Sequence, residues 1–367
     1  MQKALLWGTG QIAGQVLEQC GVMERYDVIG FIDNNTKKQG TVFWGKPVFG
    51  PQVLSEKEFD GIFVLVDKYQ EIVCQIKESL GEDARVFVEN YKYFYKQSLL
   101  KRYEACEDAQ IRAMLTRIRE KDLQVFNYDF ADKYEEIKTD VEYDSRCGLY
   151  YVWHRGKESG RKLYFARHLD SVDKVEQYYR SLLVEQDIQS PHRYLTDTFD
   201  VKEGDVVVDA GVAEGNFALD VIERASKIYL IEADEKWIEA LEETFREDRE
   251  KIVILPRYLT SMTEGQCATL DSLIKEPVNF IKMDIEGNEW DALLGAEETI
   301  RNSQDLKCAV CCYHADFDEI LIRDALGGYG MQCSVTPGFM WFPFPRRKSY
   351  VSTKFSRGIV RGIKGRV

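Results

Sequence analysis

The stretch VVVDAGVAEGNF, Val206 to Phe217, decides the fold of the second half of the chain. Its β-branched run predicts a buried strand, and the glycines that follow predict a tight turn before a helix. The same alternation recurs from Gly204 onward, with further strands expected at KIYLIEA, KIVILP, VNFIKMDI and CAVCCYH. Because strands that alternate with helices indicate a parallel sheet with crossover helices, we expect an α/β, Rossmann-like domain over residues 191–345.

The acid before the glycines indicates the charge of the ligand. Asp209 ends the first strand, where a carboxylate would repel a pyrophosphate but attract an ammonium or sulfonium group. S-adenosylmethionine (SAM) carries both of these cationic groups. Gly211 and Gly215 let the backbone pass close to a ligand. Glu232, at the end of the next strand, can accept hydrogen bonds from both hydroxyls of a ribose.

The block FIKMDIEGNEW carries candidate catalytic groups. Lys282, Asp284 and Glu286 occupy alternate positions at the carboxyl end of a strand and so lie on one side of it. Two carboxylates there cost desolvation unless something uses them, which predicts a site role for Asp284 and Glu286. Lys282 is expected to pair with a carboxylate and order the site. Glu289 follows at a helix start, where an acid ordinarily complements the helix dipole.

Four segments together resemble the FkbM family of SAM-dependent methyltransferases: VVVDAGVAEGNFAL, IYLIEAD, TLDSLI and FIKMDIEGNEWDALLGAEETI. The resemblance covers residues 186–344 and implies a class I methyltransferase fold that transfers methyl groups mostly to oxygen, often on sugars or secondary metabolites. The short connection between KIVILP and TLDSLI departs from the family, so the residues that contact adenine are not predicted. The residues expected to hold SAM are Asp209, Gly211, Glu214, Gly215, Asn216, Glu232, Ala233, Asp234 and Asp284.

The strand after Asp284 ends in the sequence CCYH, at His314. We expect His314 to face the transferred methyl group, and its ordinary pKa suits removal of a hydroxyl proton near neutral pH. Asp284 is the alternative base. Cys308, Cys311 and Cys312 lie in one strand, where they cannot easily converge on an ion. Buried thiols and no metal site are therefore expected.

SPHRY, just before the sheet, adds two candidates. His192 and Arg193 could close over SAM, with Arg193 holding its carboxylate. An equally weighted alternative is a loop that only packs the preceding connector onto the domain.

The N-terminal stretch ALLWGTGQIAG also places glycines between a strand and a helix, but no acid precedes them. Gly8, Gly10 and Asp33 match positions of the dinucleotide fingerprint, which favours a nucleotide diphosphate such as NAD or a sugar nucleotide. WGTGQIAG, GFIDNN and GKPVFGP resemble the N-terminal Rossmann-like domain of bacterial sugar O- and N-acetyltransferases, which implies a nucleotide-sugar ligand. We expect this smaller domain over residues 1–90, with a binding or purely structural role.

Two further segments complete the predicted organisation. Residues 91–190 are expected to form a helical connector with a β-hairpin that turns at GKESGR. MQCSVTP and FMWFPF are expected to close the edge of the second sheet. Residues 346–367 hold eight Lys or Arg and no acid, which indicates either a solvated basic tail or a segment that docks on an anionic surface.

Composition argues against some classes of function. A net charge of -13 argues against nucleic acid as the main partner, and no apolar run predicts a transmembrane segment. Nine cysteines without framework spacing indicate reduced thiols in the cytoplasm. We expect an O-methyltransferase that uses SAM on a small-molecule hydroxyl, such as that of a saccharide, and that is able to form a homo-oligomer. Two alternatives stay open: an NAD-dependent sugar oxidoreductase and a non-catalytic nucleotide-sugar-binding protein.

Overall fold

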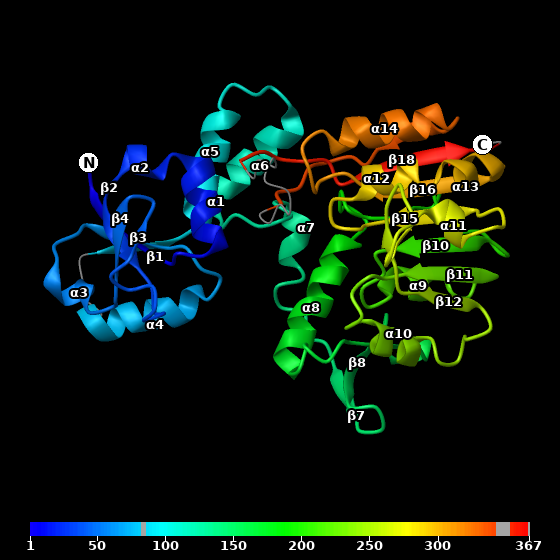
Figure 1. Cartoon of the computed structure of the whole chain (residues 1–367), viewed down its shortest axis with the longest axis horizontal. Coiled ribbons are helices and arrows are strands. Elements are labelled where there is room, and N and C mark those ends of the chain that lie inside the picture. The colour runs from blue at the N-terminus through cyan, green and yellow to red at the C-terminus, as the bar shows by residue number, and fades with distance from the viewer. Residues whose placement is uncertain (82–85, 343–352, 366–367) are drawn as a thin grey trace. The chain divides into compact units, whose positions relative to one another are not determined.

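The computed structural model describes residues 1–81, 86–342 and 353–365 (Figure 1). The chain divides into two compact units. Unit 1 comprises Met1–Gln124 and Val351–Phe355, and unit 2 comprises Val125–Tyr350 and Ser356–Val367. Within the described ranges, no helix is both long enough and apolar enough to cross a membrane.

Unit 1 is an α/β fold around one six-stranded sheet with the order β3-β4-β2-β1-β5-β6. The pairs are parallel except β3 with β4, which the sequence did not predict. Its strands are β1 (Lys3–Trp7), β2 (Asp27–Ile32), β3 (Val42–Phe43), β4 (Lys46–Phe49), β5 (Gly61–Val64) and β6 (Phe87–Asn90). Its helices are α1 (Gln11–Cys20), α2 (Val22–Arg25), α3 (Val53–Glu56), α4 (Tyr69–Leu80), α5 (Lys92–Arg102) and α6 (Ala109–Glu120).

The two units divide the expected connector between them. Helices α5 and α6 belong to unit 1, where Phe94, Tyr95 and Leu99 of α5 are buried. The rest of the connector, residues 125–190, belongs to unit 2. The amphipathic pattern correctly predicts helices in this segment, but it does not reveal which core their apolar faces join.

Unit 2 is built on a seven-stranded sheet with the order β12-β11-β10-β15-β16-β18-β17. Only β18 runs antiparallel to its neighbours, β16 and β17. The strands are β10 (Val206–Ala210), β11 (Lys227–Ile231), β12 (Ile252–Leu255), β15 (Phe280–Met283), β16 (Leu306–Cys311), β17 (Gln332–Val335) and β18 (Ile359–Lys364). A short parallel pair, β13 (Tyr258–Leu259) and β14 (Cys267–Ala268), lies outside this sheet.

Helices cover both faces of the seven-stranded sheet. Side chains of α8 (Val172–Glu185), α9 (Asn216–Val221) and α10 (Ile238–Thr244) share one apolar core with β10, β11, β15 and β16. The opposite core joins alternate residues of the same strands to α11 (Leu270–Leu273), α12 (Glu289–Leu294), α13 (Glu297–Asn302) and α14 (Asp318–Gly328). This three-layer arrangement leaves the carboxyl ends of the parallel strands free of helical cover, as in other doubly wound sheets.

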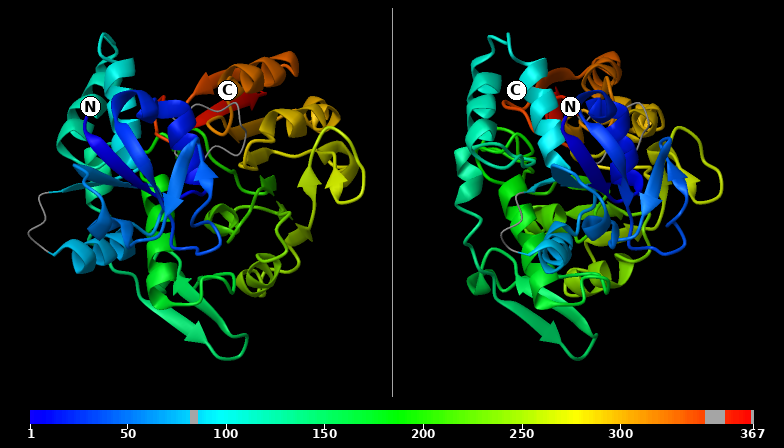
Figure 2. Two further views of the ribbon diagram at one scale, coloured as in Figure 1. Left: turned by 60° about the vertical axis from the view of Figure 1, so that its left-hand side comes forward. Right: turned by 90° about the vertical axis from the view of Figure 1, so that its left-hand side faces the viewer.

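A hairpin precedes α8 in the chain. Strand β7 (Val141–Asp144) pairs with β8 (Leu149–Trp153), which pairs with β9 (Lys162–Tyr164) across the predicted GKESGR turn. The β7–β8 hairpin projects beside α8 in both views of Figure 2. A short helix, α7 (Asp129–Asp132), completes the unit.

The basic segment at the C-terminus is not a solvated tail along its whole length. Residues 346–352 and 366–367 lie outside the described part, but Ile359–Lys364 form β18 inside the sheet. Ile359 and Val360 are fully buried, whereas the Arg361 guanidinium donates to the Arg193 carbonyl at 2.6 Å. β17 therefore pairs with β18, and residues 343–344 of the expected partner FMWFPF lie outside the described part of the chain. The apolar residues between the basic ones supply the buried side chains of this strand. The local excess of Lys and Arg gives no sign of a buried strand.

Candidate active site

Four neighbouring strands bring the predicted polar residues to one edge of the sheet. The register pairs Asp209 of β10 with Leu230 of β11 and with Lys282 of β15. Glu232 and Asp284 follow the ends of β11 and β15, and His314 follows β16. Because these strands are parallel and adjacent, their carboxyl ends lie together (Figure 1).

The glycine turn after β10 is needed for a close backbone approach. Gly211 has φ +73°, and a Cβ there would lie 1.7 Å from the Asp284 carbonyl oxygen. Gly215 caps α9 with φ +92° and faces the ring of Phe245. Gly211 therefore belongs to the edge where the strands meet, whereas Gly215 serves the packing between α9 and α10.

Asp209 is paired within the protein. Its carboxylate is fully buried and lies 3.0 Å from the Lys282 ammonium, which also donates to the Gly211 carbonyl at 2.5 Å. Burial alone would lower the pKa of Lys282, but the Asp209 and Asp284 carboxylates raise it. The expected direct contact of Asp209 with a cationic ligand is therefore not what the structure shows, because its cation is Lys282. Through this lysine, Asp209 orders the glycine turn.

Two cavities open at this edge and meet at shared residues. The larger, of about 600 Å³, extends past Glu232, Ala233 and Asp234 toward the β13–β14 pair. The smaller, of about 250 Å³, extends toward α8. The residues that line both are Gly211, Ala213, Asp284 and Glu286.

Glu232 is held in position by two backbone donors. Its Oε2 accepts from the Ala213 N–H at 2.8 Å, and its Oε1 accepts from the Asp234 N–H at 2.7 Å. A carboxylate oxygen has more than one acceptor position, so each can still receive a ligand hydroxyl. Glu232 thus presents a pre-oriented pair of acceptors to the larger cavity.

Asp284 is an ionised carboxylate at the junction of the cavities. It accepts from the Tyr194 hydroxyl at 2.8 Å, and the Tyr313 hydroxyl lies 3.4 Å from its Oδ1. Burial would raise its pKa, but His314, His192 and Lys282 lower the pKa of this carboxyl to about 2. A permanent negative charge therefore stands where both cavities meet.

His314 and Glu289 form a buried pair beside this carboxylate. The His314 Nδ1 lies 2.9 Å from Glu289 Oε1, and both Glu289 oxygens also accept from backbone N–H groups, those of Ile285 and Gly287. The His314 Nε2 lies 3.5 Å from Asp284 Oδ1. Glu289, predicted only as a helix-start acid, therefore orients the imidazole so that Nε2 faces the smaller cavity.

The protonation of His314 differs from the sequence expectation. Burial alone would lower its pKa, but Glu289, Asp284 and Glu286 raise it to about 9. In the chain without a ligand, the imidazole is therefore protonated at neutral pH. The ordinary pKa assumed from the sequence misses this because the three carboxylates become neighbours only through the fold.

Comparisons with known proteins agree with this geometry. The family model described as "Methyltransferase FkbM domain" matches residues 211–320. Unit 2 of this chain carries an FkbM methyltransferase domain. Its strand order is the Rossmann-like methyltransferase order that the resemblance implied. A second model, "C2185-like, N-terminal", matches residues 1–87.

Solved structures similar to the chain include the methyltransferase FkbM from Methylobacillus flagellatus, at 15% identity, 98% coverage of this chain, 90% of that chain and a TM-score of 0.44. An rRNA methylase from Streptococcus thermophilus matches at 14% identity, 45% and 90% coverage and a TM-score of 0.32. The magnesium protoporphyrin IX methyltransferase from Synechocystis, solved with bound SAM, matches at 15% identity, 44% and 71% coverage and a TM-score of 0.29. No curated protein matches the chain at a significant level.

The other predicted site residues of the FkbM domain divide into two groups. Glu214 and Asn216 line the smaller cavity, as does Lys282. His192 is buried behind Tyr313, with its Nε2 3.0 Å from that hydroxyl. Arg193 donates to the backbone carbonyls of Leu195 and Gln186, and its contact with a ligand carboxylate stays a prediction.

Sequence reasoning missed three groups in this site. Tyr194 and Tyr313 hold the Asp284 carboxylate, and each adjoins a residue that was singled out, which was the available signal. Glu185, at the end of α8, lines the smaller cavity together with Glu214. Burial raises the pKa of Glu185 to about 8 and that of Glu214 to about 7. No local pattern marks Glu185, because α8 reaches the cavity only through tertiary packing.

The predicted nucleotide residues of unit 1 are engaged within the loop itself. Asp33 accepts from the Asn35 N–H at 2.9 Å, from Lys38 at 3.1 Å and from the Thr9 hydroxyl. A Cβ on Gly8 would lie 2.9 Å from the Leu65 carbonyl oxygen, so packing alone requires this glycine. A nucleotide site at Gly8, Gly10 and Asp33 stays a prediction.

Proposed function

We propose that the FkbM domain transfers the methyl group of SAM to a hydroxyl of a small-molecule acceptor, and that a saccharide is the acceptor class to test first. The chain is a methyltransferase, and SAM is its cofactor. When bound, SAM supplies a methyl group on a positively charged sulfur. The observation that carries the proposal is the junction of the two cavities at Asp284, within reach of the oriented His314.

The residues present fit the cofactor. Glu232 offers two acceptors for a ribose diol in a cavity of about 600 Å³. The ionised Asp284 suits a cationic centre, and Glu286 lines both cavities beside it. Glu286 has φ +62°, an unusual conformation for a residue other than glycine, and such strain often accompanies a functional turn.

The proposed roles of the side chains follow from their positions. Methyl transfer is a displacement in line, so the protein mainly has to hold the acceptor oxygen against the methyl carbon. His314 Nε2 would receive the hydroxyl proton, with Glu289 as its positioning residue. His314 is protonated without a ligand, so it must lose a proton before it can act as a base. A cation bound beside the same carboxylates would lower the pKa of His314 and so favour this loss. Asp284, with its low pKa, is the weaker alternative base.

The free cysteines agree with the proposed cytoplasmic location. All nine cysteines are free, which suits a reducing cytoplasm. We keep the homo-oligomer as a proposal for measurement by light scattering.

The test combines binding with turnover. Calorimetry with SAM, S-adenosylhomocysteine, NAD and UDP-sugars comes first, and labelled SAM is then offered with panels of sugars, phenols and amines. We expect SAM and S-adenosylhomocysteine to bind and label to enter a hydroxyl acceptor. Label that enters only amines would contradict O-methylation, and binding of NAD without SAM would favour the oxidoreductase alternative.

A further inference from the structure

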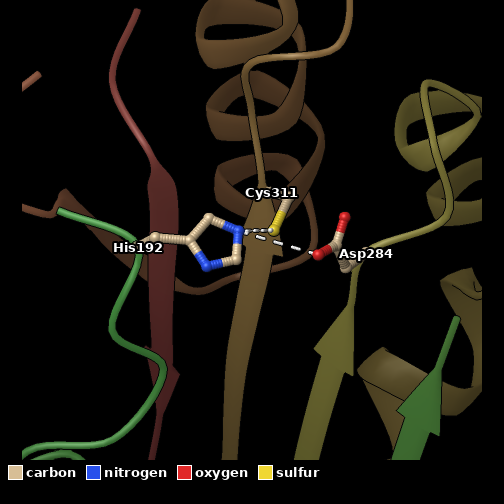
Figure 3. A group of neighbouring side chains, drawn as sticks. All are labelled: His192, Asp284 and Cys311. Atoms are coloured by element: carbon tan, nitrogen blue, oxygen red, sulfur yellow. Dashed lines mark hydrogen bonds and ion pairs between the residues drawn. The ribbon is translucent and has the colours of Figure 1, made fainter. Parts of the chain in front are cut away.

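A cluster of possible metal ligands lies behind the wall of the smaller cavity. Its members are His192 from the loop before β10, Asp284 after β15 and Cys311 at the end of β16. Figure 3 shows their side chains converging. The His192 Nε2 lies 3.6 Å from Cys311 Sγ and 3.7 Å from Asp284 Oδ2. Three segments far apart in the chain thus bring a nitrogen, an oxygen and a sulfur together.

The separations of His192 Nε2 from its two partners are close to those in a four-coordinate metal site. Bonds to zinc of about 2.0–2.3 Å in a tetrahedron place ligand atoms roughly 3.3–3.6 Å apart. The three ligand atoms all lie within 4.8 Å of one another. The Tyr313 hydroxyl, 3.0 Å from His192 Nε2 and 3.4 Å from Asp284 Oδ1, is placed to be a fourth ligand.

The donor set selects the metal. Imidazole and thiolate favour zinc over magnesium and calcium, which prefer oxygen ligands. The Asp284 carboxylate and a Cys311 thiolate would together balance the charge of a divalent ion, and Glu286, which lines both cavities, would then be the carboxylate that faces a cationic ligand. His192 is 2% exposed and Cys311 is fully buried, whereas Asp284 lines both cavities, so two of the three ligands are shielded from solvent and one faces the cavities.

We propose that His192, Asp284 and Cys311 bind one Zn²⁺ ion in the wall of the smaller cavity. The ion would join the loop before β10 to the ends of β15 and β16 and would fix the Asp284 carboxylate. The role of that carboxylate in catalysis rests on the proposed function, but the metal site itself does not. Local sequence does not reveal this site, because Cys308 and Cys311 lie in one strand, Cys312 follows it, and His192 is 119 positions from Cys311.

The test measures metal binding directly. The full chain, without an affinity tag, is expressed with added Zn²⁺, and its metal content is determined by mass spectrometry. The ion is then exchanged for Co²⁺, whose thiolate charge-transfer band reports a sulfur ligand. We expect about one Zn²⁺ per chain and a Co²⁺ spectrum of tetrahedral type, with no competition from excess Mg²⁺.

Cys311→Ser should lower the affinity for Zn²⁺ by more than about 100-fold, since loss of even an outer partner costs about 10–100-fold. The matched control is Cys312→Ser, because Cys312 is the next residue, is also buried and belongs to the core on the opposite face. It should bind Zn²⁺ and Co²⁺ as the wild type does.

Two results would overturn the site. One is wild-type protein that binds no stoichiometric Zn²⁺, and the other is a thiolate band that persists in Cys311→Ser. If Cys311→Ser does not fold, the Zn²⁺ affinity of His192→Asn and the Zn²⁺ content of the wild type decide whether the site exists. SAM affinity is measured separately, so intact SAM binding without Zn²⁺ binding would reject the metal site and leave the proposed function standing.

Discussion

At the scale of single residues, the carboxylates of unit 2 have different contacts and different roles, although each is an acid in a strand–turn–helix segment of the sequence. Asp209 is buried against Lys282, Glu232 faces the larger cavity, and Glu289 holds His314. Asp209 and Glu232 stand at strand ends, and Glu289 is the first residue of α12. Their roles therefore depend on which neighbour the fold supplies, and single substitutions can separate them.

Glu232→Ala should weaken SAM binding by about 1–3 kcal/mol, because charge-assisted hydrogen bonds to a ribose would be lost. Calorimetry with SAM measures the change, and circular dichroism checks the fold. The matched control is Glu235→Ala, since Glu235 is exposed three residues later and is not among the residues that line the larger cavity. Unchanged SAM affinity in a folded Glu232→Ala protein would remove Glu232 from the site.

His314→Gln should leave SAM affinity within about 1 kcal/mol of wild type while turnover falls by roughly 10²–10⁴, the usual contribution of a positioned base. The reason is geometric, because Nε2 faces the smaller cavity whereas Glu232 lies in the larger one. Turnover is measured with the acceptor that the labelled-SAM screen identifies. Near-normal turnover would leave Asp284, or no protein base, as the explanation.

At the scale of elements, ion pairs and short strands join segments that the sequence treats separately. Asp220 of α9 accepts from Arg155 at 2.7 Å, and its Oδ1 lies 2.7 Å from His154 Nε2. Both partners follow β8. Burial would raise the pKa of Asp220, but His154 and Arg155 lower it to about 2.

This shift predicts a pH dependence of stability. The folded pKa of Asp220 lies below its ordinary value of 3.8, so its contribution is present above about pH 4 and is lost as the pH falls toward 2. The full contribution is up to about 2 kcal/mol. Urea unfolding of wild type and Asp220→Asn between pH 5 and 3 measures it, and the difference between the two should shrink with acidification. A constant difference would contradict the assignment.

Strand β18 predicts a second effect at this scale. Val360 is a fully buried residue of β18, so Val360→Asp should destabilise unit 2 by at least about 3 kcal/mol through an unpaired buried charge. Thermal or urea unfolding measures the loss. If the segment were a solvated tail, the variant would unfold within about 0.5 kcal/mol of wild type.

At the scale of the whole molecule, the division into units predicts where SAM binds. A fragment from Val125 to the C-terminus should bind SAM with the affinity of the full chain, and Asp33→Ala in the full chain should leave that affinity unchanged. A fragment that begins at Asp187 should bind more weakly, because it lacks α8, whose Val175, Tyr179 and Leu182 belong to the apolar core beneath the sheet, so the fold of unit 2 is weakened. Calorimetry compares the three proteins, and loss of SAM binding in Asp33→Ala would refute this division.

The sequence by itself indicated strands at residues 205–210, 227–233, 278–285 and 308–314, which overlap β10, β11, β15 and β16. It also indicated the glycine turn and the edge at which polar residues gather. It could do so because period, turn chemistry and strand direction are local properties of the chain. The likeness of one segment to FkbM methyltransferases followed from the same local blocks. Both the parallel sheets and the positions of Glu232, Asp284 and His314 were predictable in this way.

Only the tertiary structure decided what those residues touch. Asp209 meets Lys282, His314 meets three carboxylates, and β18 enters the sheet from beyond the expected domain boundary. His192 reaches Cys311 across 119 positions. Burial and charge act through space, so the pKa values and the candidate metal ligands depend on neighbours that no stretch of sequence contains.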